Sequence, residues 1–250
     1  MLFTKKVLKK YIILTSTAAP DFLQGIKTLD QLTGALKRLS NEQKQEFLAF
    51  VDSINDNFFK SELGGEAVLL YHGSPEEKIE KEGLQIKEGH RGGPFGSNQK
   101  VKNQGIFLTD SKSMAHFFGQ NRAEYPTQYK VYQAYVRLGK TLDLSKLTLQ
   151  GFLKKVALEI LNKYNGTAKK NFVVRDIWWL LDQEKFIDEI KKEGFNSVKF
   201  KEDSHIKKTS GDSSAHTYLV FNPQDIIVKS DANSKIKTLE DLLDYLNSSG

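Results

Sequence analysis

Residues 67–74 read Ala-Val-Leu-Leu-Tyr-His-Gly-Ser, and this stretch decides the fold. An unbroken run of apolar and aromatic residues of this length is typical of a buried strand. The run ends at His72-Gly73. Ser74-Pro75 then has the composition of a helix start, with serine as the cap and proline in the first turn. The sequence therefore predicts a buried strand whose end carries polar groups, followed by a short helix that ends at Gly83.

Upstream of this strand the pattern is helical. Thr28 and Ser40 each stand three residues before a glutamine, which is the spacing of a capping box. Apolar residues then recur at helical spacing as far as Phe58, and Gly64-Gly65 provides a hinge. Three regions are expected: a helical N-terminal region over residues 1–64, a main domain over residues 65–230, and a C-terminal helix or tail over residues 231–250.

Downstream, strands and helices are mixed along the chain. Gly105-Ile106-Phe107-Leu108 predicts a second strand, and Asp110 can cap the helix after it. Aromatic and β-branched residues dominate 127–138, which indicates a long strand. The other expected elements are helices at about 148–163 and 175–193, strands at 197–200, 217–221 and 226–228, a closing helix with leucines from Leu239 to Leu246, and loops at 87–104 and 201–215.

Composition and charge narrow the class of protein. Hydrophobic residues make up 39% and charged residues 27%, which is typical of a globular protein, and no apolar run reaches the roughly 18 residues needed to cross a bilayer. Cysteine is absent, which excludes disulfides and thiolate catalysis, and the five histidines are scattered, so no metal site is expected. The net charge of +6 is dispersed over the sequence. We therefore expect a solvated basic surface rather than a dedicated nucleic-acid interface.

The N-terminus carries basic residues before the short apolar stretch Tyr11-Ile12-Ile13-Leu14. That stretch is shorter than the roughly 7–15 apolar residues of a secretory signal. We expect an amphipathic or extended basic segment there, with an export signal as the alternative.

Three motifs follow one another along the main domain: Leu69–Ser74, Gly105–Thr109 with Ala115-His116-Phe117, and Tyr218–Pro223. Together they resemble the strand motifs of diphtheria-toxin-type and poly(ADP-ribose) polymerase-type ADP-ribosyltransferases. Residues 131–144 and 194–198 are similar to the phage polyvalent-protein branch of that superfamily. The resemblance covers about two-thirds of the chain. It implies an α+β ADP-ribosyltransferase fold of two packed, mainly antiparallel sheets, with the N-terminal helices as an appendage.

The resemblance implies a site that takes NAD⁺ as co-substrate and cleaves its nicotinamide–ribose bond. In the family the motif histidine bonds a ribose hydroxyl, the glycine backbone and a helix serine bind the amide, and two aromatic rings hold the pyridinium. The residues that match are His72, Gly73, Ser74, Phe107, Ser113 and Phe117. Stacking on a cationic ring is favourable for phenylalanine. Each residue also has an ordinary alternative, since the two phenylalanines can be core residues and Ser74 a helix cap.

The third motif departs from the family at Thr217. Active polymerase-type enzymes carry glutamate there, and a carboxylate orients the ribose hydroxyl, whereas threonine can only hydrogen-bond. Thr217 completes the expected catalytic set with His72 and Phe107, and its replacement by glutamate is expected to raise NAD⁺ glycohydrolysis. A carboxylate from the loop before the last strand can substitute; the candidates are Glu202, Asp203 and Asp212.

Three functional hypotheses result. The first is mono-ADP-ribosyl transfer from NAD⁺ to a macromolecular acceptor, a protein or a nucleic acid. The second is a catalytically degenerate NAD-binding or phage virion-associated structural protein, which Thr217 favours and which would have capsid or virion proteins as partners. The third is an RNA 2′-phosphotransferase of related fold, which His72-Gly73 fits, although its second histidine and arginine set is not found. We expect no membrane partner, and a location in the cytoplasm or in a phage virion that delivers the protein to the host cytoplasm.

Overall fold

The computed structural model describes residues 18–92, 98–122, 128–146, 149–165, 174–202, 211–212, 214–230 and 233–249. The chain divides into two compact units. One contains the residues up to Ala67 together with those from Lys229 onward, and the other is Val68–Val228. The basic segment expected near the N-terminus and the candidate carboxylate Asp203 lie outside the described residues.

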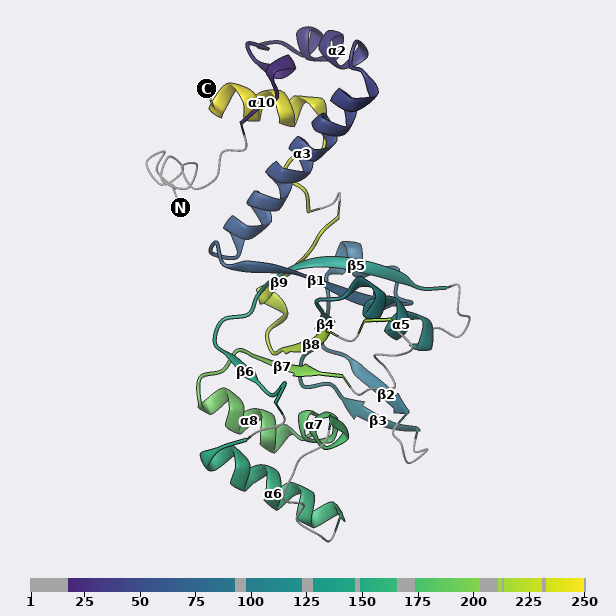
Figure 1. The fold of residues 1–250 in the computed structure, drawn as a ribbon, viewed down its shortest axis with the longest axis vertical. Coiled ribbons are helices and arrows are strands. Elements are labelled where there is room, and N and C mark those ends of the chain that lie inside the picture. Colours follow the sequence, from purple (N-terminus) through teal and green to yellow (C-terminus); the bar gives the residue numbers. More distant parts are fainter. Residues whose placement is uncertain are drawn as a thin grey trace. The chain divides into compact units, whose positions relative to one another are not determined.

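The first unit is helical (Figure 1). Its elements are η2 (Asp21–Leu23), α2 (Leu29–Lys37), α3 (Asn41–Glu62) and α10 (Leu239–Ser249). Thr28 and Ser40 form the capping boxes that the sequence predicts, each with the glutamine three residues further on. Leu32, Ile54 and Leu242 share one apolar core. The C-terminal helix thus packs in the same core as the helices from the start of the chain.

A buried asparagine joins the two chain segments of this unit. Asn55 on α3 accepts a hydrogen bond from the backbone N–H of Ile236 at 2.8 Å and donates one to its carbonyl at 3.4 Å. Lys229 Nζ lies 2.9 Å from Asp56 Oδ1 and 3.6 Å from Asp52 Oδ1. The segment that leads to α10 is therefore tied to α3 by hydrogen bonds and charge as well as by apolar contact.

The second unit is built on a seven-stranded mixed sheet. Its strands are β1 (Ala67–Ser74), β4 (Ile106–Thr109), β5 (Lys130–Arg137), β6 (Thr141–Asp143), β7 (Ser197–Lys201), β8 (His216–Val220) and β9 (Ile226–Val228), in the order β6-β7-β8-β4-β1-β5-β9. The β6–β7 pair is parallel, whereas β7–β8, β8–β4, β4–β1 and β5–β9 are antiparallel. The predicted α+β class is confirmed. The expected separation into two sheets is not confirmed, because β4 pairs with both β8 and β1 and so joins the strands into one sheet.

Two apolar cores bury the central strand β8 on both faces. Leu219 packs in a core with α6 (Gly151–Asn165), α7 (Val174–Leu181) and α8 (Glu184–Lys192), and Figure 1 shows these three helices grouped beside β6 and β7. Tyr218 and Val220 point the other way, into a core with residues of β4, β5 and β9. Burial on both faces explains why residues 217–221 form a nearly continuous apolar run.

Three elements differ from the expectations. The loop expected at 87–104 contains an antiparallel hairpin of β2 (Glu88–Gly92) and β3 (Asn98–Lys102), which its glycine- and lysine-rich composition does not indicate. The helix expected at 175–193 ends at Leu181, because tight turns follow and α8 starts anew at Glu184. The short helix α4 (Ile79–Glu82) begins later than Ser74-Pro75, since β1 continues through Ser74.

Helix α5 (Lys112–Arg122) packs beside β5 and β4. The helices formed by the described residues include none with the length and apolar character that a membrane span requires.

Candidate functional site

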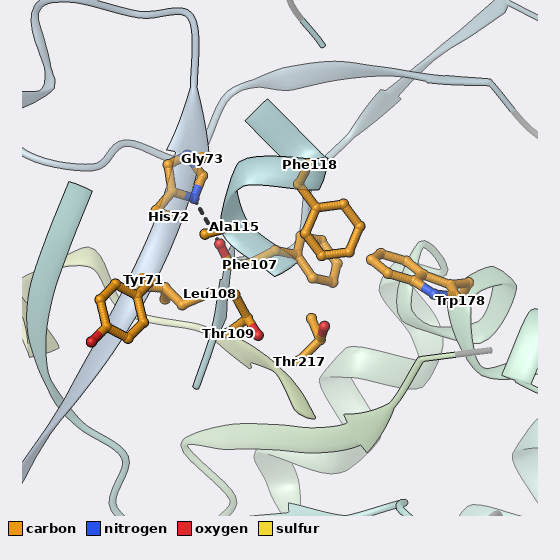
Figure 2. Close-up of a pocket in the computed structure, with 10 residues that line it drawn as sticks. All are labelled: Tyr71, His72, Gly73, Phe107, Leu108, Thr109, Ala115, Phe118, Trp178 and Thr217. Atoms are coloured by element: carbon orange, nitrogen blue, oxygen red, sulfur yellow. Dashed lines mark hydrogen bonds between the residues drawn. The ribbon is translucent and has the colours of Figure 1, made fainter. Parts of the chain in front are cut away.

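A pocket lies where β1, β4 and β8 meet the helices α5 and α7 (Figure 2). The residues that line it are Tyr71, His72, Gly73, Phe107, Leu108, Thr109, Ala115, Phe118, Trp178 and Thr217. All three sequence motifs, which are far apart in the chain, contribute to this one pocket. Among the sequence-predicted residues, the structure brings together His72, Gly73, Phe107 and Thr217.

The imidazole of His72 is fixed by a neighbouring strand. Its Nδ1 lies 2.8 Å from the carbonyl oxygen of Phe107. A carbonyl oxygen can only accept, so Nδ1 carries the hydrogen, and Nε2 of the neutral ring is an acceptor. The hydrogen bond therefore sets both the tautomer and the orientation of the ring at the pocket wall.

Aromatic rings from three elements form the apolar side of the pocket. The rings of Phe107 and Trp178 have centroids 4.9 Å apart and an interplanar angle of 31°. Trp178 also meets Phe200 edge-on at 5.1 Å. Figure 2 shows Phe118 on the same side of the pocket as these rings. A planar cation is favoured beside such faces, because ring quadrupoles attract positive charge.

A buried carboxylate lies directly behind the pocket wall. Glu202 follows β7 and is 2% exposed. Thr217 donates a hydrogen bond to Glu202 Oε1, and Trp178 Nε1 donates one to Oε2 at 3.0 Å. Val198, Phe200 and Glu202 alternate along the strand onto one face, and Phe200 pairs in register with Thr217. Glu202 therefore lies on the same face of the strand as Val198 and Phe200, where its carboxylate contacts Thr217 and Trp178, two residues that line the pocket.

Gly73 allows α5 to approach β1. A Cβ atom at this position would lie 1.8 Å from the carbonyl oxygen of Ala115 and 2.7 Å from the backbone nitrogen of Gly119. Gly119 faces Gly73 in turn, with 3.2 Å between its own hypothetical Cβ and the Gly73 Cα. Close packing of α5 on β1 is sufficient to require glycine at both positions, independently of any contact between the Gly73 backbone and a ligand.

Comparison with known families identifies the family of the chain. The family model described as "ADP-Ribosyltransferase in polyvalent proteins" matches residues 63–236. The chain belongs to this ADP-ribosyltransferase family. The match confirms the resemblance to the polyvalent-protein branch, and it supports ADP-ribosyl transfer as the general activity. ADP-ribosyltransferases generally use NAD⁺ as the substrate.

Two other comparisons add little. No curated protein matches the chain. A solved structure described as "Crystal structure of an anti-CRISPR protein" aligns with this ADP-ribosyltransferase over 66% of this chain and 98% of that chain, with 15% identity and a TM-score of 0.32. A TM-score of that size supports no conclusion about fold or function.

Three residues expected in the ADP-ribosyltransferase site do not line the pocket. Ser74 is buried and accepts a hydrogen bond from the backbone N–H of Glu76 at 3.2 Å. Ser113 is exposed, and its hydroxyl lies 2.9 Å from that of Ser111. Phe117 lies next to Phe118 on α5, and it is the latter that lines the pocket. Ser74 and Ser113 thus take part in local turn and helix-start contacts in this structure.

The carboxylate candidates Glu202 and Asp212 differ in what they contact. Glu202 contacts Thr217, whereas Asp212 lies in the turn that leads into β8. Asp212 Oδ1 accepts from the backbone N–H groups of Ser214 and Ala215 at 3.0 and 3.1 Å. Hydrogen bonding lowers the pKa of Asp212, first from the Ser111 side chain and then from Ser214. Asp212 is therefore engaged in holding the turn.

Six pocket residues were not expected in the site from the sequence: Tyr71, Leu108, Thr109, Ala115, Phe118 and Trp178. Ala115 and Phe118 are three positions apart on α5, so helical periodicity places them on one face, and that pairing was available as a signal. Trp178 belongs to a helix without any family motif, and nothing in its local sequence indicates contact with Phe107. Among the described residues, no group of three or more His, Cys, Asp or Glu side chains is arranged to hold a metal ion.

Proposed function

We propose that this ADP-ribosyltransferase transfers single ADP-ribose units from NAD⁺ to a macromolecular acceptor. The observation that carries the proposal is the meeting of His72, Phe107 and Thr217, from β1, β4 and β8, in one pocket. The family match supports the reaction class. The acceptor is a protein or a nucleic acid, reached in the cytoplasm of the cell that makes the protein or of a host into which a virion delivers it.

The reaction breaks the bond between the ribose C1′ and the nicotinamide nitrogen. The electron pair of that bond leaves with nicotinamide, which becomes neutral, and positive charge develops on the ribose as an oxocarbenium ion. The acceptor nucleophile then bonds to C1′ and loses a proton. The site must therefore hold a cation rigidly before and during bond cleavage.

The pocket residues fit these tasks. Phe107 and Trp178 present ring faces to a pyridinium cation. His72, whose ring orientation is fixed by the Phe107 carbonyl, has Nε2 as an acceptor for a ribose hydroxyl. Thr217 adds a side-chain hydroxyl to the pocket lining.

The rings must separate for NAD⁺ to bind. The pocket has a free volume of about 20 Å³, which is room for about one water molecule. A planar ring inserted between Phe107 and Trp178 needs a centroid separation of roughly 7 Å, two stacking distances, in place of 4.9 Å. We propose that the rings of Phe107 and Trp178 move apart when nicotinamide binds.

The finer arrangement of the sheet is part of the proposal. Tyr132 and Val136 of β5 share an apolar core with Ile106 and Leu108 of β4, although β1 lies between these strands in the sheet order. We propose that the sheet curls into two packed layers around this core.

A non-catalytic NAD-binding protein that assembles with capsid or virion proteins is the second candidate. Thr217 favours it, since threonine stands where active polymerase-type relatives have glutamate.

Transfer can be tested with NAD⁺ labelled in its adenylate group, incubated with a cell lysate and the protein. We expect label on macromolecules and release of nicotinamide, with a mass increase of one ADP-ribose per modified site. His72→Ala is the matched inactive variant. NAD⁺ binding by the wild-type protein without label transfer or nicotinamide release would overturn the enzymatic proposal in favour of the binding protein.

A further inference from the structure

We propose that Glu202 is a positioning residue that acts through Thr217. Together the two side chains would orient the ribose hydroxyl, which is the role of the glutamate that active polymerase-type relatives carry at the position of Thr217. This inference rests on the proposed function. Thr217 touches the pocket, and Glu202 stands one hydrogen bond behind it.

The hydrogen-bond directions support a relay. The hydroxyl hydrogen of Thr217 points to Glu202 Oε1, so the lone pairs of Thr217 Oγ1 remain to accept a hydrogen bond from the pocket side. A hydroxyl that donates to a carboxylate becomes a stronger acceptor, because consecutive hydrogen bonds polarise one another. A ribose hydroxyl that donates to Thr217 is thereby connected to the negative charge of Glu202.

Trp178 fixes the other end of the carboxylate. An indole N–H can only donate, so Glu202 Oε2 is an acceptor in this contact, at 3.0 Å. The same indole ring packs against Phe107 at the pocket and against Phe200 on β7. Glu202 is thus held by two of the residues that line the pocket, one on each of its oxygen atoms.

The position of the charge suits the chemistry. Glu202 is 2% exposed, and water screens a buried charge little. In bound NAD⁺ the positive charge lies on the pyridinium ring, and it moves onto the ribose as the bond breaks. A fixed negative charge that is linked to a ribose hydroxyl through Thr217 favours the second location, so it stabilises the oxocarbenium ion more than bound NAD⁺, without reorganisation during the reaction. Removal of the charge should therefore slow bond cleavage more than it weakens NAD⁺ binding.

A relay makes a specific prediction for three variants: Glu202→Gln, Thr217→Val and the double variant. Each keeps side-chain volume close to the wild type. If Glu202 acts only through Thr217, each single variant lowers kcat for nicotinamide release by a similar factor, roughly 10- to 100-fold, and the double variant loses no more. Independent roles would instead multiply the two factors. NAD⁺ affinity, measured by calorimetry, is expected to change less than about threefold in Glu202→Gln.

A rescue variant tests the relay in a second way, by restoring a carboxylate at the pocket wall. Thr217→Glu combined with Glu202→Gln moves the carboxylate to the pocket wall and leaves an amide behind it. We expect this variant to exceed Thr217→Val in nicotinamide release. Thr217→Glu alone should not, which replaces the expectation from the sequence, because Glu202 already contacts Thr217 and the substitution would place two carboxylates side by side.

The outcomes separate the two proposals. A wild-type protein that releases nicotinamide, with Glu202→Gln equally active, overturns the relay and leaves the proposed function standing. Multiplying losses in the double variant, or a rescue variant no better than Thr217→Val, also overturns the relay alone. A wild-type protein without nicotinamide release overturns the proposed function, and the relay fails with it.

Discussion

Thr217 on β8 donates its hydroxyl hydrogen to Glu202, the residue that follows β7. Both side chains are almost fully buried, at 1% and 2% exposure. The residue that departs from the family pattern is therefore paired with a carboxylate supplied by the adjacent strand.

This pairing contributes to stability as well as to the site. Thr217→Val removes a donor to a buried carboxylate and is expected to lower the free energy of unfolding by about 1–3 kcal/mol. Thr217→Ser keeps the hydroxyl and should cost about 1 kcal/mol or less. Urea denaturation of the three proteins measures the difference. Equal losses for the valine and serine variants would mean that the hydroxyl contributes nothing.

Gly73→Ala tests the close approach of α5 to β1. The added Cβ would lie 1.8 Å from the carbonyl oxygen of Ala115, so strand or helix must shift. We expect a loss of about 3 kcal/mol or more, at the upper end for overpacking. Gly34→Ala on α2 is the control, because its Cβ meets no atom within 4 Å and alanine favours a helix. Thermal unfolding that is unchanged in Gly73→Ala would contradict the packing.

Much of this arrangement follows from the sequence, and the part that does not has a physical reason. The capping boxes at Thr28 and Ser40, and the strand that carries His72, depend on neighbouring residues, so local patterns predict them. Phe118 could have been chosen over Phe117 from helical spacing with Ala115. The contact of Trp178 with Phe107 could not, because it depends on how α7 packs on the sheet.

The role of Glu202 was also only partly predictable from the sequence. The sequence names it as one of three carboxylates that can substitute for the missing glutamate. Only the register of β7 against β8, with Phe200 opposite Thr217, selects it over Asp212. The alternation of Val198, Phe200 and Glu202 was a usable signal, since it extends the inward face of the strand to a charged residue.

Trp178 provides a direct optical readout of binding. The chain has two tryptophans, Trp178 and Trp179, so Trp179→Phe isolates the first. If nicotinamide separates the rings of Phe107 and Trp178, saturating NAD⁺ should change the fluorescence of Trp178 markedly, and ADP-ribose, which lacks the ring, should change it less. Identical responses to the two ligands would place the nicotinamide elsewhere.

The raised pKa of Tyr218 predicts that the free energy of unfolding depends on pH. Burial, followed by the Asp110 carboxylate, raises the pKa of Tyr218 from 10.0 to about 12. The folded protein keeps this hydroxyl protonated where the unfolded chain loses the proton. The contribution of Tyr218 is therefore fully present below pH 10.0 and is lost as the pH rises from 10.0 to about 12. Wild type should lose more unfolding free energy between about pH 9 and about pH 11 than Tyr218→Phe. Parallel losses in the two proteins would contradict the shift.

NAD⁺ affinity in a pair of histidine variants tests the central claim most directly. His72 lines the pocket, whereas His116 is exposed on α5 and contacts Tyr129, outside the pocket lining. We predict that the wild-type protein and His116→Ala bind NAD⁺ with equal affinity, as measured by calorimetry. We expect a folded His72→Ala protein to bind NAD⁺ at least about tenfold more weakly, because it loses one hydrogen bond of about 1.5 kcal/mol. Unchanged NAD⁺ affinity in a folded His72→Ala protein would contradict the assignment of this pocket.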